Sequence, residues 1–139
     1  MVCNTNIDHR SRRRAGNMID TARAPVDERA FTSICYELGA DEAHIWTASL
    51  DQPADMIANL APLLSRDEYQ MAMRYHRPVD RDRFIVGRGI LRKIHSAYLA
   101  LSPGQLRFTY NEYGKAAVSD DQNDCALNFN LSHSGELVL

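Results

Sequence analysis

The clearest pattern of apolar positions in the chain lies in residues 78–101. Apolar or small residues recur there at alternating steps of three and four, the spacing of one face of an α-helix that packs against another element. Pro78 suits the first turn of this helix, because a first turn leaves its backbone N–H groups unpaired and proline has none. The sequence therefore predicts a long helix whose packed face carries Phe84, Gly87, Leu91, Ile94, Tyr98 and Leu101.

Two weaker helices are predicted before this one. The first covers residues 53–64, and the second begins at Ser65, where Glu68 three positions later completes a capping box. Within the long helix, Gly87 and Gly89 each cost about 1 kcal/mol relative to alanine. We interpret them either as positions where another backbone or a bulky ligand comes close, or as glycines that the helix simply tolerates.

Short apolar segments that favour strands lie on both sides of the helices. Residues 43–49, AHIWTAS, come first. The segments QLRFTY, KAAVS, ALNFNLSHS and ELVL follow the helices and are separated by turns and a polar loop. In ALNFNLSHS, two-residue alternation places Asn130, Ser132 and Ser134 on one face and His133 on the other. This segregation predicts an α+β domain with the helices packed on one face of a small mixed or antiparallel sheet.

Residues 1–40 show no comparable pattern. They begin with a basic stretch, RSRRR, and contain only a weak helical pattern around residues 27–38. An isolated basic stretch of this kind is more often a solvated tail than a nucleic-acid patch. We therefore expect a poorly ordered leader, with room for one short helix, over residues 1–40 and a single folded domain over residues 41–139.

Composition narrows the class of protein. The 139 residues are 45% hydrophobic and 24% charged with a net charge of -2, as in an ordinary globular protein of the cytoplasm. No apolar stretch is long enough for a membrane span or a signal peptide. The slightly acidic balance gives no general attraction to nucleic acid, and the three cysteines lack disulfide or metal-ligand spacing. We therefore expect a cytoplasmic protein with no membrane, nucleic-acid or zinc partner.

Basic residues are concentrated in one segment. Residues 74–93 hold seven arginines and lysines against two aspartates, a local charge of +5. On a helical wheel, Arg81, Arg88 and Arg92 fall on one exposed stripe, whereas Arg83 lies beside the apolar face and points toward the interior. A solvated arginine face is common. Arg83 needs a partner for its fork of donors, either a phosphate of a ligand or a structural carboxylate.

Polar residues near the end of the chain suggest chemistry. Ser132 and His133 are adjacent, and adjacent strand residues point to opposite faces, so they cannot form a nucleophile and base pair with each other. Taken alone, Lys115 is typical of a solvated turn and His133 of a core histidine. Taken together, Arg83, Lys115, Ser132 and His133 offer cations and hydrogen-bond donors from separate elements, which suits a ligand with several phosphates.

Five segments of the chain occur in the order of a known family: HIWTASLDQP, LSRDEYQMAMRYH, DRDRFIVGRGILRKI, LRFTYNEYGKA and LNFNLSHSG. With them the chain resembles the N-terminal half of Sfp-type 4'-phosphopantetheinyl transferases. The resemblance implies one half of a pseudo-two-fold fold, with coenzyme A and Mg2+ bound between the halves. It also implies transfer of the phosphopantetheine arm of coenzyme A to a serine of an acyl or peptidyl carrier protein.

The same resemblance assigns four residues to coenzyme A binding. Lys115 matches the family lysine that contacts a coenzyme A phosphate, although Ala116 stands where the family has proline. Ser132 and His133 match the residues that hold the 3'-phosphoadenosine and pyrophosphate region. Arg83 lies in the helix segment that lines the nucleotide pocket.

The matched segments stop before two family motifs, GIDxE and WxxKEA, which supply the magnesium ligands and the acid–base glutamate. We therefore expect no catalytic and no metal-binding residue in this chain, and no transfer by the chain alone. Three explanations stay open: a partial gene product, a C-terminal half supplied by a second chain, and a non-catalytic binder of coenzyme A or of a carrier protein. An exposed half-interface could also cause self-association.

Overall fold

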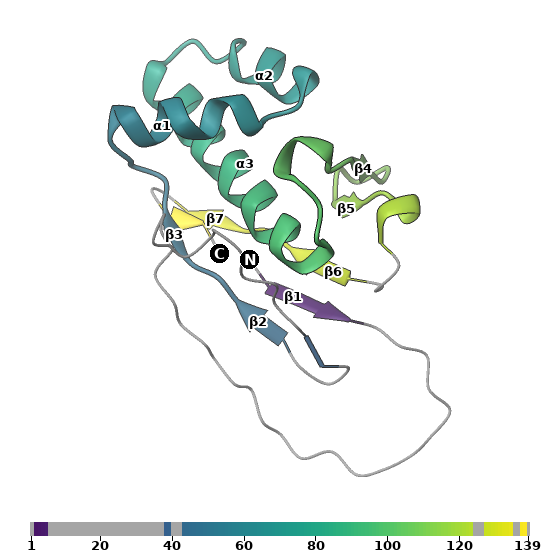
Figure 1. The fold of residues 1–139 in the computed structure, drawn as a ribbon. Helices are drawn as coiled ribbons and strands as arrows, with labels where there is room; N and C mark the ends of the chain where they lie inside the picture. The colour runs from purple at the N-terminus through teal and green to yellow at the C-terminus, as the bar shows by residue number, and fades with distance from the viewer. Residues whose placement is uncertain (1, 6–37, 40–42, 124–126, 135–136, 139) are drawn as a thin grey trace, which may run out of the picture.

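The structure is a computed structural model that describes residues 2–5, 38–39, 43–123, 127–134 and 137–138. Within them, three α-helices follow one another in the middle of the chain, with short strands before and after them (Figure 1). No helix in these ranges combines the length and the apolar character that crossing a membrane requires. The helices are α1 Ala54–Leu60, α2 Arg66–Ala72 and α3 Pro78–Leu99, and the 3-10 turns are η2 Ala61–Leu63, η3 Pro103–Gln105 and η4 Asp120–Gln122.

The described strands pair in an antiparallel manner in three small sheets. One sheet has the order β2-β1-β6 and another the order β3-β8-β7, while β4 and β5 form a hairpin. The strands are β1 Val2–Thr5, β2 Ala43–Ile45, β3 Ala48–Ser49, β4 Phe108–Tyr110, β5 Ala116–Val118, β6 Leu127–Asn130, β7 His133–Ser134 and β8 Leu137–Val138.

Helix α3 lies at the centre of the domain and organises its core. Helices α1 and α2 lie against one side of α3, and the strands lie toward the other (Figure 1). Leu127 and Phe129 of β6 and Val118 of β5 complete the apolar core. These contacts confirm the predicted α+β class. The buried positions of α3 spread all round its axis: Ile85, Val86, Gly89, Ile90, Leu91, Arg92, Ile94 and His95.

The predicted helix boundaries are confirmed in part. Ser65 caps α2 as predicted: its Oγ accepts from the Glu68 N–H at 3.2 Å, and the Glu68 carboxylate accepts from the Ser65 N–H at 2.9 Å. Pro78 begins α3. The prediction of one helix over residues 53–64 is wrong, because the chain tightens after Leu60 into η2, where Pro62 cannot donate the next α-helical hydrogen bond.

The strand predictions identified the segments that form strands but not how these segments divide into separate strands and sheets. Residues 43–49 form two strands, β2 and β3, which belong to different sheets. Between them Trp46 is buried, and its Nε1 donates to the Tyr98 hydroxyl at 3.1 Å. No strand was predicted in residues 1–40, yet β1 is the central strand of its sheet. Residues 6–37 lie outside the described residues, so the expectation for that leader stays a prediction.

Helix α1 packs closely against α3 at Gly89. A Cβ added there would lie 2.8 Å from the Cβ of Leu60 and 3.0 Å from its Cδ2. At Gly87 an added Cβ would meet nothing nearer than the Cδ2 of Leu50, at 3.4 Å. A close neighbour is therefore present at Gly89, but it is the side chain of Leu60 and not the backbone or bulky ligand that was considered from the sequence.

Candidate functional site

Lys115 lies at the end of the tight turn that joins β4 and β5. The Asn111 side chain fixes this turn, because its Oδ1 accepts from the backbone N–H of Tyr113 at 3.0 Å and from that of Lys115 at 2.9 Å. Gly114 adopts a φ of 76°, which favours glycine, and donates from its N–H to the Asn111 carbonyl at 2.9 Å. The Lys115 side chain is exposed. The turn therefore holds the backbone of the lysine in place while its ammonium group faces solvent.

Ser132 lies between β6 and β7. Within β6, buried and exposed residues alternate, which confirms the predicted pattern up to Asn130. Beyond that point the predicted alternation is wrong, because β6 ends at Asn130 and both Leu131 and Ser132 are exposed. The Ser132 hydroxyl is thus accessible to a ligand. His133 begins β7, and only its backbone is described, so the face that its ring takes stays a prediction.

Arg83 lies on α3 and binds a carboxylate on the loop between β3 and α1. Its Nε donates to Asp51 Oδ1 at 2.6 Å and its Nη2 to Asp51 Oδ2 at 3.0 Å. The two side chains are 30% and 46% exposed. The prediction that Arg83 points to the interior is wrong, and the alternative of a structural carboxylate partner is confirmed. Because a guanidinium fork fits phosphate as well as carboxylate, the role of Arg83 in ligand binding stays a prediction.

Arg88 and Arg92 bind the buried carboxylate of Glu68, so the prediction that they share an exposed stripe is wrong. Arg88 Nε and Nη2 donate to Glu68 Oε1 at 2.9 and 2.6 Å, and Arg92 Nε donates to Oε2 at 2.7 Å. Arg92 Nη1 also donates to the carbonyls of Pro103 and Leu106, at 2.7 and 3.0 Å. The prediction failed because it assumed one packed face, whereas α3 is buried all round. We call Ser65, Glu68, Arg88 and Arg92 the Glu68 cluster.

Opposing effects set the ionisation of Glu68. Burial works to raise its pKa, but the hydrogen bonds from Arg92 and the Ser65 N–H, together with the charges of Arg88 and Arg92, outweigh burial and hold the pKa below its usual value. The carboxylate therefore stays charged at neutral pH. The capping role of Glu68 was predicted from the sequence, and this second role was not. The available signal was the four-residue spacing of Arg88 and Arg92, which places both on one side of a helix.

The elements that carry the candidate residues meet around α3. Arg83 precedes Arg88 by five residues, about 7.5 Å along the helix axis, and Arg88 contacts Tyr110 at the turn end of the β4–β5 hairpin. Strand β5 of that hairpin lies against β6, which leads to Ser132. The structure thus brings the elements together. No hydrogen bond within the described residues joins Lys115 to Ser132, so any link between the two would come from a ligand.

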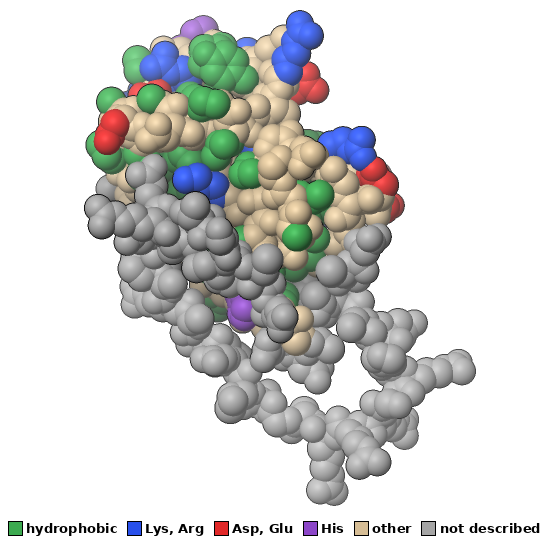
Figure 2. All heavy atoms as spheres, in the orientation of Figure 1, with side chains coloured by type: hydrophobic (Ala, Val, Ile, Leu, Met, Phe, Trp, Pro, Cys, Tyr) green, Lys and Arg blue, Asp and Glu red, His purple; other side chains and the backbone are tan. Residues whose placement is uncertain are grey.

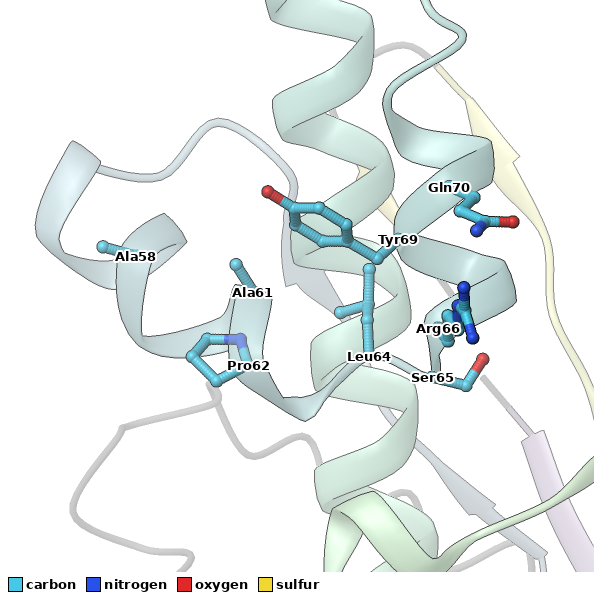
Figure 3. A pocket seen from close by; sticks show the side chains of 8 residues that line it. All are labelled: Ala58, Ala61, Pro62, Leu64, Ser65, Arg66, Tyr69 and Gln70. Carbon is cyan, nitrogen blue, oxygen red and sulfur yellow. The ribbon is translucent and has the colours of Figure 1, made fainter.

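An open groove lies elsewhere, between α1 with η2 on one side and α2 on the other (Figure 3). It has a volume of about 590 Å³ and is lined mainly by apolar side chains. Arg66 and Tyr69 of α2 also line it. Figure 2 shows hydrophobic side chains gathered at this end of the molecule, where Tyr69 is 46% and Met73 47% exposed. None of the four candidate residues lines the groove, so it forms no part of the candidate site.

The described residues do not present a magnesium site. Within them, no three side chains of His, Cys, Asp or Glu come together as ligands. Mg2+ prefers carboxylate oxygens, and two of the carboxylates on the candidate elements, Asp51 and Glu68, are each bound by arginine. The residues present therefore do not fit the metal that the resemblance implies, and no chemical step is derived through it.

The fold and the site together define a small α+β domain whose exposed lysine, serine hydroxyl and surface arginine suit a polyanionic ligand. Comparison with known proteins then gives the family. Residues 45–139 match the family described as 4'-phosphopantetheinyl transferase, N-terminal, and the chain belongs to this family.

Three relatives illustrate the similarity. The 4'-phosphopantetheinyl transferase HetI of Nostoc sp. is 46% identical over 100 residues, which are 72% of this chain and 42% of HetI. A putative 4'-phosphopantetheinyl transferase of Synechocystis sp. is 36% identical over 70% of this chain and 39% of its own length. The 4'-phosphopantetheinyl transferase Sfp of Bacillus subtilis is 27% identical over 68% of this chain and 42% of its own. The chain thus spans about two-fifths of the length of these relatives.

Proposed function

We propose that this chain binds coenzyme A and acts as the coenzyme-A-binding part of a 4'-phosphopantetheinyl transferase. The reaction would move the phosphopantetheine arm of coenzyme A to a serine hydroxyl of an acyl or peptidyl carrier protein. The observation that carries the proposal is Lys115, which stands exposed on a turn that its own hydrogen bonds make rigid. The family match over residues 45–139 includes this turn and the segment of Ser132 and His133.

Each candidate residue has a distinct part in this proposal. Coenzyme A carries a pyrophosphate and a 3'-phosphate, so its binding requires cations and hydrogen-bond donors that replace water. The ammonium group of Lys115 pairs with one phosphate, and the Ser132 hydroxyl and the His133 ring donate to others. Arg83 contributes through its fork, and a phosphate would compete there with the Asp51 carboxylate.

Calorimetric titration of the chain with coenzyme A tests the binding proposal. We expect adenosine 3',5'-bisphosphate to compete with coenzyme A and pantetheine, which has no phosphate, not to compete. Lys115→Ala should weaken binding at least tenfold, because a hydrogen bond to a charged group contributes about 1.5 to 3 kcal/mol.

Arg66→Ala is the matched control for this loss, since Arg66 is an exposed cation that lines the separate groove between α1 and α2. Its affinity for coenzyme A should equal that of the unaltered chain. Equal losses for Arg66→Ala and Lys115→Ala would mean that binding reflects general positive charge, which contradicts the assigned site.

Transfer itself is tested by mass spectrometry of an apo carrier protein incubated with coenzyme A, Mg2+ and the chain. The expectation that the chain alone gives no transfer stays a prediction, and turnover by the chain alone would contradict it. A longer version that includes the GIDxE and WxxKEA segments of the family should transfer the arm. Tight binding of coenzyme A without transfer by either version would instead favour a non-catalytic binding module.

A further inference from the structure

The β4–β5 hairpin depends on contacts outside itself. Among the described strands, β4 and β5 pair only with each other, and an isolated two-stranded hairpin is marginally stable in water. At its open end Phe108 lies opposite the buried Val118, and both belong to the core packing. At its closed end Tyr110 lies opposite Ala116. Tyr110 is therefore the last residue of β4 before the turn that carries Lys115.

Arg88 of α3 holds Tyr110 in place. The Tyr110 hydroxyl accepts a hydrogen bond from Arg88 Nη2, and the guanidinium carbon lies 5.7 Å from the centre of the Tyr110 ring and 5.3 Å from that of Phe108. The Tyr110 side chain is 56% exposed, so this contact does little to cover the core. It fixes instead where the closed end of the hairpin lies relative to α3.

The guanidinium that holds Tyr110 is itself immobilised. Its two bonds to Glu68 Oε1 leave the Arg88 side chain 11% exposed. Glu68 is fixed in turn by the Ser65 N–H and by Arg92. Since each member is bound by the next, a continuous series of contacts runs from α2 through α3 to the Tyr110 hydroxyl.

The turn transmits this position to Lys115. Asn111 follows Tyr110 directly, and its backbone N–H donates to the Lys115 carbonyl at 3.1 Å while its Oδ1 accepts from the Lys115 N–H at 2.9 Å. These bonds tie the Lys115 backbone to the residue that follows Tyr110, so a shift of Tyr110 would shift Lys115 with it.

We infer that Tyr110 and Arg88 are positioning residues of the coenzyme A site: their contact sets the Lys115 turn so that the ammonium group meets a phosphate of the ligand. This inference rests on the proposed function and adds two residues that need not touch the ligand. A purely structural role for Tyr110 makes a different prediction, because loosening the domain would lower its stability and weaken every contact with the ligand alike.

Tyr110→Phe tests the inference, since it keeps the ring and removes only the hydroxyl. Titration with coenzyme A should show a dissociation constant about five times larger, the effect of one net hydrogen bond. The variant should stay folded under the conditions of the titration, because the hydrogen bond that it loses is a single, partly exposed contact. Tyr113→Phe is the matched control, because Tyr113 lies on the same turn, is 85% exposed, and its hydroxyl has no partner within the described residues. It should bind coenzyme A like the unaltered chain.

A double-mutant cycle separates positioning from general loosening. In a Lys115→Ala background, Tyr110→Phe should change the dissociation constant less than twofold, because the group that it positions is gone. A fivefold loss that persists in that background overturns the inference, as does a Tyr110→Phe variant with unchanged affinity. In both cases the proposed function stands. Failure of the unaltered chain to bind coenzyme A overturns the proposed function and the inference with it.

Discussion

At the scale of single residues, buried ion pairs join the helices of this domain in a way that the sequence pattern does not indicate. The capping box of Ser65 and Glu68 could be predicted because both partners lie within one helical turn. The bonds from Glu68 to Arg88 and Arg92 could not, because they join residues 20 and 24 positions apart. The capping role of Glu68 can therefore be predicted from the sequence. Its binding to Arg88 and Arg92 cannot, because it depends on how α2 packs against α3.

His95 is a second buried polar residue, and its ring is neutral. Its Nδ1 donates to the Leu91 carbonyl at 2.9 Å, and its ring packs edge-on against Phe129 and Phe108. Within the described residues, the buried Nε2 has no hydrogen-bond partner. Burial lowers the pKa of His95 to about 4; the bond to Leu91 opposes this shift and the charge of Arg88 adds to it.

The low pKa of His95 predicts a loss of stability in mild acid. Because the folded pKa of about 4 lies below the ordinary 6.5, the unfolded chain binds the proton more readily. The stabilisation is therefore complete above pH 6.5 and declines as the pH falls toward 4. From pH 7 to pH 5 the loss should be about 2 kcal/mol, measured as the free energy of unfolding in urea.

His95→Leu removes the titrating ring and should flatten the dependence on pH in this interval. His76→Gln, which removes an exposed histidine of the loop between α2 and α3, is the control and should keep the full slope. An unchanged slope in His95→Leu would show that other groups cause the loss. Below pH 4.5 Glu68 adds a further loss, because its lowered pKa makes its stabilisation disappear as the carboxylate is protonated.

At the scale of elements, α3 shows what a one-dimensional pattern can and cannot supply. Its start at Pro78 and its apolar spacing were predicted, because both follow from local geometry. The buried position of Arg92 on this helix was not predicted, because the prediction assumed that one side of the helix faces solvent. Helices α1 and α2, the strands and the hairpin together leave little of the middle of α3 exposed. In a central helix, a polar residue on the apparent outer face can therefore be a core residue.

The close packing of α1 on α3 predicts that Gly89→Ala is less stable than Gly87→Ala. Both substitutions gain about the same helix propensity. Only the methyl group at residue 89 would collide with a neighbour fixed to the backbone, 2.8 Å from the Cβ of Leu60. The difference in the free energy of unfolding should be about 1 to 3 kcal/mol. Chemical denaturation of the two variants measures it, and equal stabilities would show that α1 moves aside without cost.

At the scale of the whole molecule, the sequence indicates the class of fold well and the division of its sheets poorly. The order of helices and strands was enough for the α+β class, because that class depends only on segregation along the chain. Strand ends depend on partners far away: β3 pairs with β8, and β1 joins β2 to β6. The residues of a short apolar segment do not indicate which distant strand it will pair with.

The candidate site divides in the same way. Lys115 and Ser132 were predicted from motifs, and the structure shows both side chains exposed. The groups that hold the surrounding elements, Asp51 for Arg83 and Tyr110 for Arg88, were missed. Binding residues belong to short motifs, whereas their supports come from other elements, so a single sequence reveals the first set more readily than the second.

The Glu68 cluster also has a consequence for how the native state opens. Helix α2 has seven residues, too few to persist alone in water, so the carboxylate that links it to α3 should make the two helices open as one cooperative unit. Glu68→Gln should separate them: amide hydrogen exchange in α2 should become at least tenfold faster than exchange in the middle of α3. Asp67→Asn, the exposed neighbour on the same turn, should leave both helices exchanging together.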